Sequence, residues 1–163
     1  RISRNRRSLY LSALRSQLFN EVLADRVARH TWNSIEPGDT CMLHGSRSLF
    51  NEDEVSEDIR QRAASGDLHP GLPLWGRGAG SDGPFARVRQ VLEPQADVCQ
   101  FLESAGLELG WRPARLLPDD FCWQFCDDGS LQLDFALGAG AYATALLAEL
   151  VRYIEDSNSG NGA

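Results

Sequence analysis

The sequence lacks the long apolar runs that place a chain in or across a membrane. Nothing in its 163 residues approaches the ~18 consecutive apolar residues that a membrane span needs. The first residues, RISRNRR, also lack the apolar stretch of a secretory signal. We therefore expect a chain with no membrane contact.

Cysteine is scarce and lysine is absent. The four cysteines are too few for a disulfide scaffold at this length, which favours a reducing, cytoplasmic setting; they are Cys41, Cys99, Cys122 and Cys126. All 16 basic residues are arginine. Arginine suits bidentate contact with phosphate, although genome base composition explains the bias at least as well.

Positive charge gathers at one end of an acidic chain. The net charge is -7 and the isoelectric point is near 4.9, which argues against a protein held mainly by a polyanion. The first 30 residues, however, carry a local charge of +5, because seven arginines stand there against Glu21 and Asp25. The remaining 133 residues carry -12.

Hydrophobic spacing predicts a long amphipathic helix over 8–30, with Arg15 and Arg26 on its polar face. Solvation and phosphate contact are equally good interpretations of that face. A turn and two short strands, 40–43 and 48–50, are expected next.

Asn51 then has the character of an N-cap for a short helix that ends at Gly66. The Gly- and Pro-rich segment 66–84 predicts a long loop that touches an apolar surface. Helices are expected over 85–93 and 94–104.

After Pro113, apolar residues alternate with other residues and no longer follow helical spacing. Short antiparallel strands are expected over 116–117, 121–125 and 131–137, followed by a helix and a mobile polar tail over 156–163. The predicted fold class is therefore α+β, a mixed α/β arrangement.

Three groups of residues each have part of the pattern of a known type of site, but none of them is complete. Gly138, Gly140 and Ala143 have the spacing of a dinucleotide fingerprint, but no further strand with an acidic residue follows them. Cys122 and Cys126 lack the second cysteine pair or histidines of a zinc site. The three histidines stand beside no nucleophile motif. We expect neither a metal nor a cofactor.

Two segments contain specific residue motifs in addition to a hydrophobic pattern. Residues 7–20, RSLYLSALRSQLFN, resemble the RS..LSA.RS.LFN helix of the TruD family of tRNA pseudouridine synthases. Residues 137–150, LGAGAYATALLAEL, are similar to that family's LPAGSYAT....REL segment. Gly38, Asp39, Arg115, Pro118 and Trp123 fall in the family's order between them. Two such motifs in order make chance convergence improbable.

The resemblance implies a domain division and a reaction. Residues 1–116 are similar to most of an α/β domain inserted in this family, and 117–155 to the C-terminal part of its catalytic domain; the flexible tail expected from composition follows over 156–163. The family isomerises uridine 13 of tRNA, without a cofactor, after the nucleotide is flipped from its stack. Its catalytic Asp belongs to an N-terminal GxKDxxAxTxQ motif that this sequence does not contain. We therefore expect a C-terminal portion, inactive without the N-terminal part of the same protein.

The resemblance also implies site residues. Tyr142 matches the family's aromatic residue that packs on the target uracil, and Gly140 and Thr144 shape the corner around it. The expected contacts with the tRNA backbone are Arg4, Arg6, Arg7 and Arg15. Three positions depart from the family pattern: Gly138 replaces Pro, Ala141 replaces Ser and Ala148 replaces Arg. The alternative is a non-catalytic, Arg-rich module that binds RNA or a protein.

Overall fold

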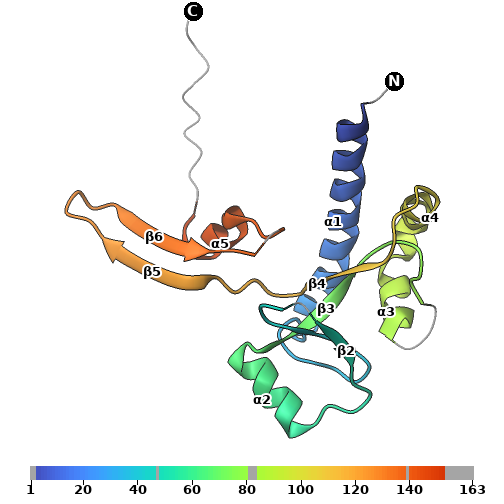
Figure 1. Cartoon of the computed structure of the whole chain (residues 1–163), viewed down its shortest axis with the longest axis horizontal. Coiled ribbons are helices and arrows are strands. Elements are labelled where there is room, and N and C mark those ends of the chain that lie inside the picture. Colours follow the sequence, from blue (N-terminus) through green and yellow to red (C-terminus); the bar gives the residue numbers. More distant parts are fainter. Residues whose placement is uncertain (1–2, 47, 81–83, 139, 153–163) are drawn as a thin grey trace, which may run out of the picture. The chain divides into compact units, whose positions relative to one another are not determined.

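The computed structural model of the chain contains both helices and antiparallel sheets (Figure 1), which confirms the predicted α+β class. The structure describes residues 3–46, 48–80, 84–138 and 140–152. The predicted tail over 156–163 lies outside these residues. The chain divides into two compact units, Arg1–Arg115 and Leu116–Ala163. Among the described helices, none combines the length and apolar character needed to cross a bilayer.

The first unit is built on one long helix, α1 (Arg4–Ala28). It begins earlier than predicted because Ser3 caps it, its hydroxyl accepting a hydrogen bond from the Arg6 N–H at 3.4 Å. The apolar face of α1 buries Leu18, Phe19 and Val22, while all residues from Ser3 to Tyr10 are exposed. The first turns of α1 therefore extend beyond the sheet (Figure 1).

A four-stranded sheet lies against α1, in the order β2-β1-β3-β4. Its strands are β1 (Thr40–Leu43), β2 (Leu49–Asn51), β3 (Leu68–Leu74) and β4 (Gly110–Pro113), and every neighbouring pair is antiparallel. The prediction of a loop over 66–84 was wrong for β3. The expected apolar contact is present, because Leu72 and Trp75 are buried there.

Short helices complete the first unit: α2 (Glu57–Ser65), α3 (Pro84–Val91), the 3-10 turn η1 (Glu93–Gln95) and α4 (Ala96–Ser104). The predicted N-cap of α2 was wrong. Asn51 ends β2, and Ser56 caps α2 by accepting from the Ile59 N–H at 3.3 Å. Gly66 ends α2 as predicted, with a left-handed φ of 90° that favours glycine.

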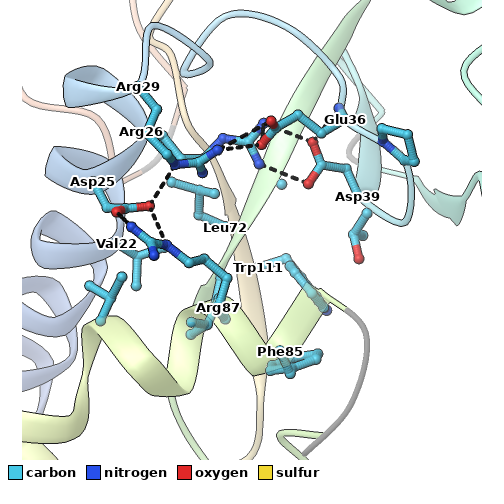
Figure 2. Close-up of a pocket in the computed structure, with 16 residues that line it drawn as sticks. Val22, Asp25, Arg26, Arg29, Glu36, Asp39, Leu72, Phe85, Arg87 and Trp111 are labelled. Atoms are coloured by element: carbon cyan, nitrogen blue, oxygen red, sulfur yellow. Dashed lines mark hydrogen bonds and ion pairs between the residues drawn. The ribbon is translucent and has the colours of Figure 1, made fainter.

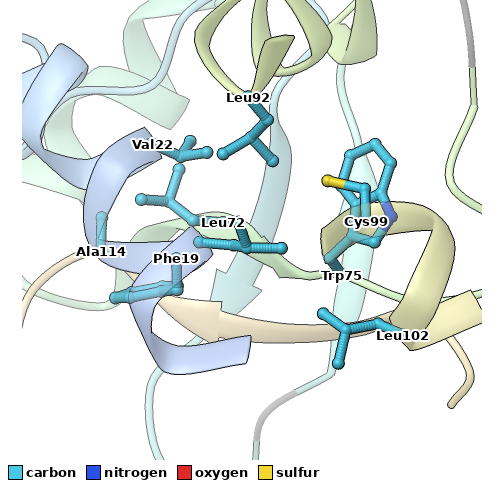
Figure 3. Close-up of a cluster of buried hydrophobic side chains, with 9 residues drawn as sticks. Phe19, Val22, Leu72, Trp75, Leu92, Cys99, Leu102 and Ala114 are labelled. Atoms are coloured by element: carbon cyan, nitrogen blue, oxygen red, sulfur yellow. The ribbon is translucent and has the colours of Figure 1, made fainter. Parts of the chain in front are cut away.

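The main core gathers side chains from α1, β3, α4 and the segments between them (Figure 3); it comprises Leu18, Phe19, Val22, Leu72, Trp75, Leu92, Cys99, Leu102 and Ala114. Trp75 is only 1% exposed, and its Nε1–H donates to Glu103 Oε1 at 2.9 Å. Because that donor is paired, the indole is buried without an unsatisfied polar group. A second cluster joins β1, α2 and the start of β3 around Cys41, Ile59 and Leu68.

The second unit is a hairpin followed by a helix: β5 (Asp119–Phe125), β6 (Leu131–Ala136) and α5 (Ala143–Leu150). The predicted hairpin is confirmed, with a turn over 127–129. The strand predicted over 116–117 is absent, since these residues pair with no described strand. No described residue of this unit is buried.

Candidate nucleic-acid interface

Tyr142 stands exposed at the corner between β6 and α5. Its residue is 64% exposed, and it occupies the N-cap position of α5 in an extended conformation with φ -120°. Its backbone carbonyl accepts the Ala145 N–H at 3.0 Å, which fixes the start of the helix. A ring in this position is not part of a core. It presents its faces to solvent.

The two neighbours assigned with Tyr142 also lie open. Gly140 has φ 89°, a left-handed conformation that favours glycine, and nothing lies within 4 Å of a Cβ built on it. Thr144 is exposed in the first turn of α5. The corner therefore leaves the backbone accessible to a flat ligand beside Tyr142.

The hairpin beside this corner presents an apolar face. Trp123 pairs with Leu133 and Phe125 pairs with Leu131 across the two strands, so these four side chains share one face. Trp123 is 62% exposed and Phe125 is 71% exposed. Cys122, Gln124, Gln132 and Asp134 alternate with them on the other face. A sheet face this apolar is typical of a surface that other protein covers.

In the first unit, a groove of about 410 Å³ lies along the exposed part of α1. Three of the four predicted backbone contacts line it: Arg4, Arg7 and Arg15. Arg6 does not. Arg112, from β4, also lines the groove, and sequence reasoning missed it.

Arg15 forms the half-buried floor of this groove. Its Nη2 donates to the Leu74 carbonyl at 2.8 Å and to the Glu108 carbonyl at 3.0 Å. Burial lowers the pKa of Arg15, and the nearby positive charge of Arg112 lowers it further. Its Nε is buried without a hydrogen-bond partner among the described atoms. Arg15 thus joins α1 to β3 and to the segment before β4.

Arg26 is neither solvated nor open to phosphate, which corrects both interpretations of its side chain. It is 5% exposed, and its Nη1 and Nη2 donate to the two carboxylate oxygens of Asp39 at 2.7 and 2.8 Å. Nη2 also donates to the carbonyls of Thr31 and Ser34. The guanidinium therefore fastens the end of α1 to the turn before β1.

A cavity of about 300 Å³ adjoins this ion pair (Figure 2). Arg87 and Arg29 both donate to Asp25 at its edge, and hydrogen bonding from Arg87 is the main cause that lowers the pKa of Asp25. Phe85 and Trp111 meet edge to face below, with ring centres 5.8 Å apart. The charged groups that the described residues contribute to this cavity are paired with one another, so these groups offer no free charge to an anion.

Two histidines that are 25 residues apart in the sequence meet in the first unit. Arg115 Nε donates to His69 Nδ1 at 2.8 Å, so His69 carries its proton on Nε2 and donates it to His44 Nδ1 at 2.9 Å. Burial lowers the pKa of His69 to about 4, with further lowering by Arg115 and His44. Arg115 also donates to the carbonyls of Ala63 and Leu68. This cluster fixes the last residue of the first unit.

Within the described residues, no three His, Cys, Asp or Glu side chains gather as metal ligands.

Comparison with known proteins identifies the class. The family model described as tRNA pseudouridine synthase D (TruD) matches residues 1–150. The chain belongs to this family. It is 44% identical to tRNA pseudouridine synthase D of Methylococcus capsulatus over 94% of this chain and 44% of that protein. It is 42% identical to the protein of the same name from Aeromonas salmonicida, over 96% of this chain and 47% of that protein. The chain therefore spans less than half the length of these relatives.

Proposed function

We propose that this chain is the C-terminal portion of a tRNA pseudouridine synthase that isomerises uridine 13 of tRNA. The observation that carries the proposal is the placement of Tyr142. The residue that matches the family's uracil-packing aromatic is 64% exposed, on an open corner between a strand and a helix. Family membership supports the reaction class.

Tyr142 acts by stacking on the flipped uracil. Stacking of a base on an aromatic ring is worth about 1–3 kcal/mol, which corresponds to roughly 5- to 150-fold in an equilibrium or rate. The positive φ of Gly140 turns the backbone just before the ring and leaves space beside it. These residues hold the base while a carboxylate elsewhere in the protein takes part in breaking and remaking the glycosidic bond.

The other catalytic residues belong to the rest of the protein. We infer that the second unit packs against further polypeptide, because one face of its hairpin is apolar; that face consists of Trp123, Phe125, Leu131 and Leu133. The GxKDxxAxTxQ motif is absent from this sequence, so we infer that the chain alone is inactive. We propose a cytoplasmic location, which the small number of cysteines supports.

The test compares Tyr142→Ala and Tyr142→Phe in the complete protein, with tRNA as substrate. Tyr142→Ala is expected to lower kcat/KM for pseudouridine formation by about 5- to 150-fold, the range of a lost stacking contact. Tyr142→Phe keeps the ring and most of the activity. Phe101→Ala is the matched control, because Phe101 is an aromatic residue 50% exposed on α4. Wild-type kinetics in Tyr142→Ala would remove this residue from the site.

The second candidate function is a module that binds RNA or a protein without chemistry. The groove lined by Arg4, Arg7, Arg15 and Arg112 favours it, because anion binding there needs no catalytic residue. Binding of tRNA without pseudouridine formation by the complete protein would establish this alternative.

A further inference from the structure

Among the described residues of the first unit, most arginines without an acidic partner line the groove along α1. Six other arginines of the first unit, outside the groove, form ion pairs with acidic side chains: Arg26, Arg29, Arg60, Arg62, Arg77 and Arg87. Arg15, Arg89 and Arg115 donate to backbone carbonyls instead. Within the described residues of the first unit, this leaves Arg4, Arg6, Arg7 and Arg112 with neither an acidic partner nor a carbonyl partner for their guanidinium groups. Three of these four line the groove.

The described residues that line the groove carry no negative charge. The chain has 23 acidic residues, yet none of those that the structure describes lines this groove. Its other polar groups are the hydroxyls of Ser8, Ser12 and Ser16, which can donate hydrogen bonds. In a chain of net charge -7, solvation alone gives no reason for this separation of charge.

Two of the cations are held in place close to each other. Arg15 is fixed by the carbonyls of Leu74 and Glu108, and the guanidinium of Arg112 lies 5.0 Å from the centre of the Phe19 ring. The proximity of Arg112 is one cause of the lowered pKa of Arg15. Like charges held together repel, and a bound anion relieves that repulsion. Because both side chains are already ordered, binding costs little further side-chain entropy.

The length of the groove indicates an extended anion. Arg4 and Arg15 are eleven residues apart on one helix, which corresponds to about 16 Å along its axis. Arg7 lies between them on the same side. A single phosphate group contacts only one part of such a row, whereas a chain of phosphodiesters follows all of it.

We propose that this groove binds successive phosphates of the RNA backbone, through Arg4, Arg7 and Arg112, with Arg15 as the positioning residue at its floor. The choice of RNA as the polyanion rests on the proposed function. Arg112 thus joins the residues expected to contact RNA phosphates, and Arg6, which does not line the groove, is not among them.

The experiment measures tRNA affinity of the complete protein by fluorescence anisotropy across a range of potassium chloride concentrations. The variants are Arg4→Gln/Arg7→Gln and Arg112→Gln. Each lost charge-assisted contact is expected to weaken binding about tenfold. It should also reduce the magnitude of the slope of log affinity against log salt by about 1 per phosphate contact. Arg4 and Arg7 are exposed, so their replacement leaves the fold intact.

Arg60→Gln is the matched control, because Arg60 is an exposed arginine on α2 that pairs with Glu57. It should leave both affinity and slope unchanged. Wild-type affinity and slope in Arg4→Gln/Arg7→Gln would overturn the assignment, as would an equal loss in Arg60→Gln.

Pseudouridine formation is measured separately, which distinguishes the two proposals. A slope that falls in the groove variants, in a protein that forms no pseudouridine, supports the groove and overturns the proposed function. Pseudouridine formation with an unchanged slope overturns the groove and leaves the function standing.

Discussion

Replacing Asp39 by asparagine should destabilise the first unit by about 3 kcal/mol. Removing one partner of a buried ion pair costs roughly 3–5 kcal/mol, because it leaves an uncompensated buried charge. Here Arg26 is 5% exposed and Asp39 is 8% exposed. The lower end of the range applies because Arg26 keeps its bonds to the Thr31 and Ser34 carbonyls, and Glu36 lies 3.6 Å away.

Urea unfolding of the chain, followed by tryptophan fluorescence and circular dichroism, measures this change in free energy. The double variant Arg26→Met/Asp39→Asn removes both charges, so it should lose less stability than the sum of the two single variants. Arg60→Gln breaks an exposed pair and should cost less than about 1 kcal/mol. A loss below about 1 kcal/mol in Asp39→Asn, or strict additivity in the double variant, would refute the assignment of a buried, coupled pair.

Two further predictions concern stability. The pKa of His69 is lowered from 6.5 to about 4, so between these values the unfolded chain takes up a proton that the folded chain does not. The free energy of unfolding should therefore fall as the pH is lowered through that window, and His69→Gln should lessen this fall; equal pH profiles of the urea midpoint would contradict it. Gly76→Ala should cost about 1–3 kcal/mol in the same assay, because its Cβ would lie 2.5 Å from the Glu108 carbonyl; wild-type stability would show that this segment shifts freely.

Local patterns identified most helices and missed the central strand. β3 contains Pro70, Gly71 and Pro73, which are disfavoured inside strands. The sheet accommodates them because β1 pairs with 68–71 and β4 with 71–74. Pro70 pairs only with β1 and Pro73 only with β4, so neither proline lies between two paired strands. Only the tertiary pairing reveals this arrangement.

The candidate site was predictable where a motif carried it. Tyr142, Arg7 and Arg15 lie in the two segments that resemble a known family. Arg112 and the contact between His44 and His69 depend on strands whose pairing no local pattern gives. Likewise, helical spacing alone places Arg26 on the polar face of the helix. Its burial depends on Asp39, which lies 13 residues later in the sequence and accepts a hydrogen bond from it.

Release of tritium from tRNA labelled at C5 of uridine tests the central claim most directly. Formation of the new carbon–carbon bond displaces the hydrogen at C5, so tritium release reports the isomerisation itself. The complete protein should release tritium from tRNA, and the 163-residue chain alone should release none. Release by the chain alone would contradict the account, because it would place the catalytic carboxylate within this sequence, at a residue such as Asp119, Asp120 or Asp134.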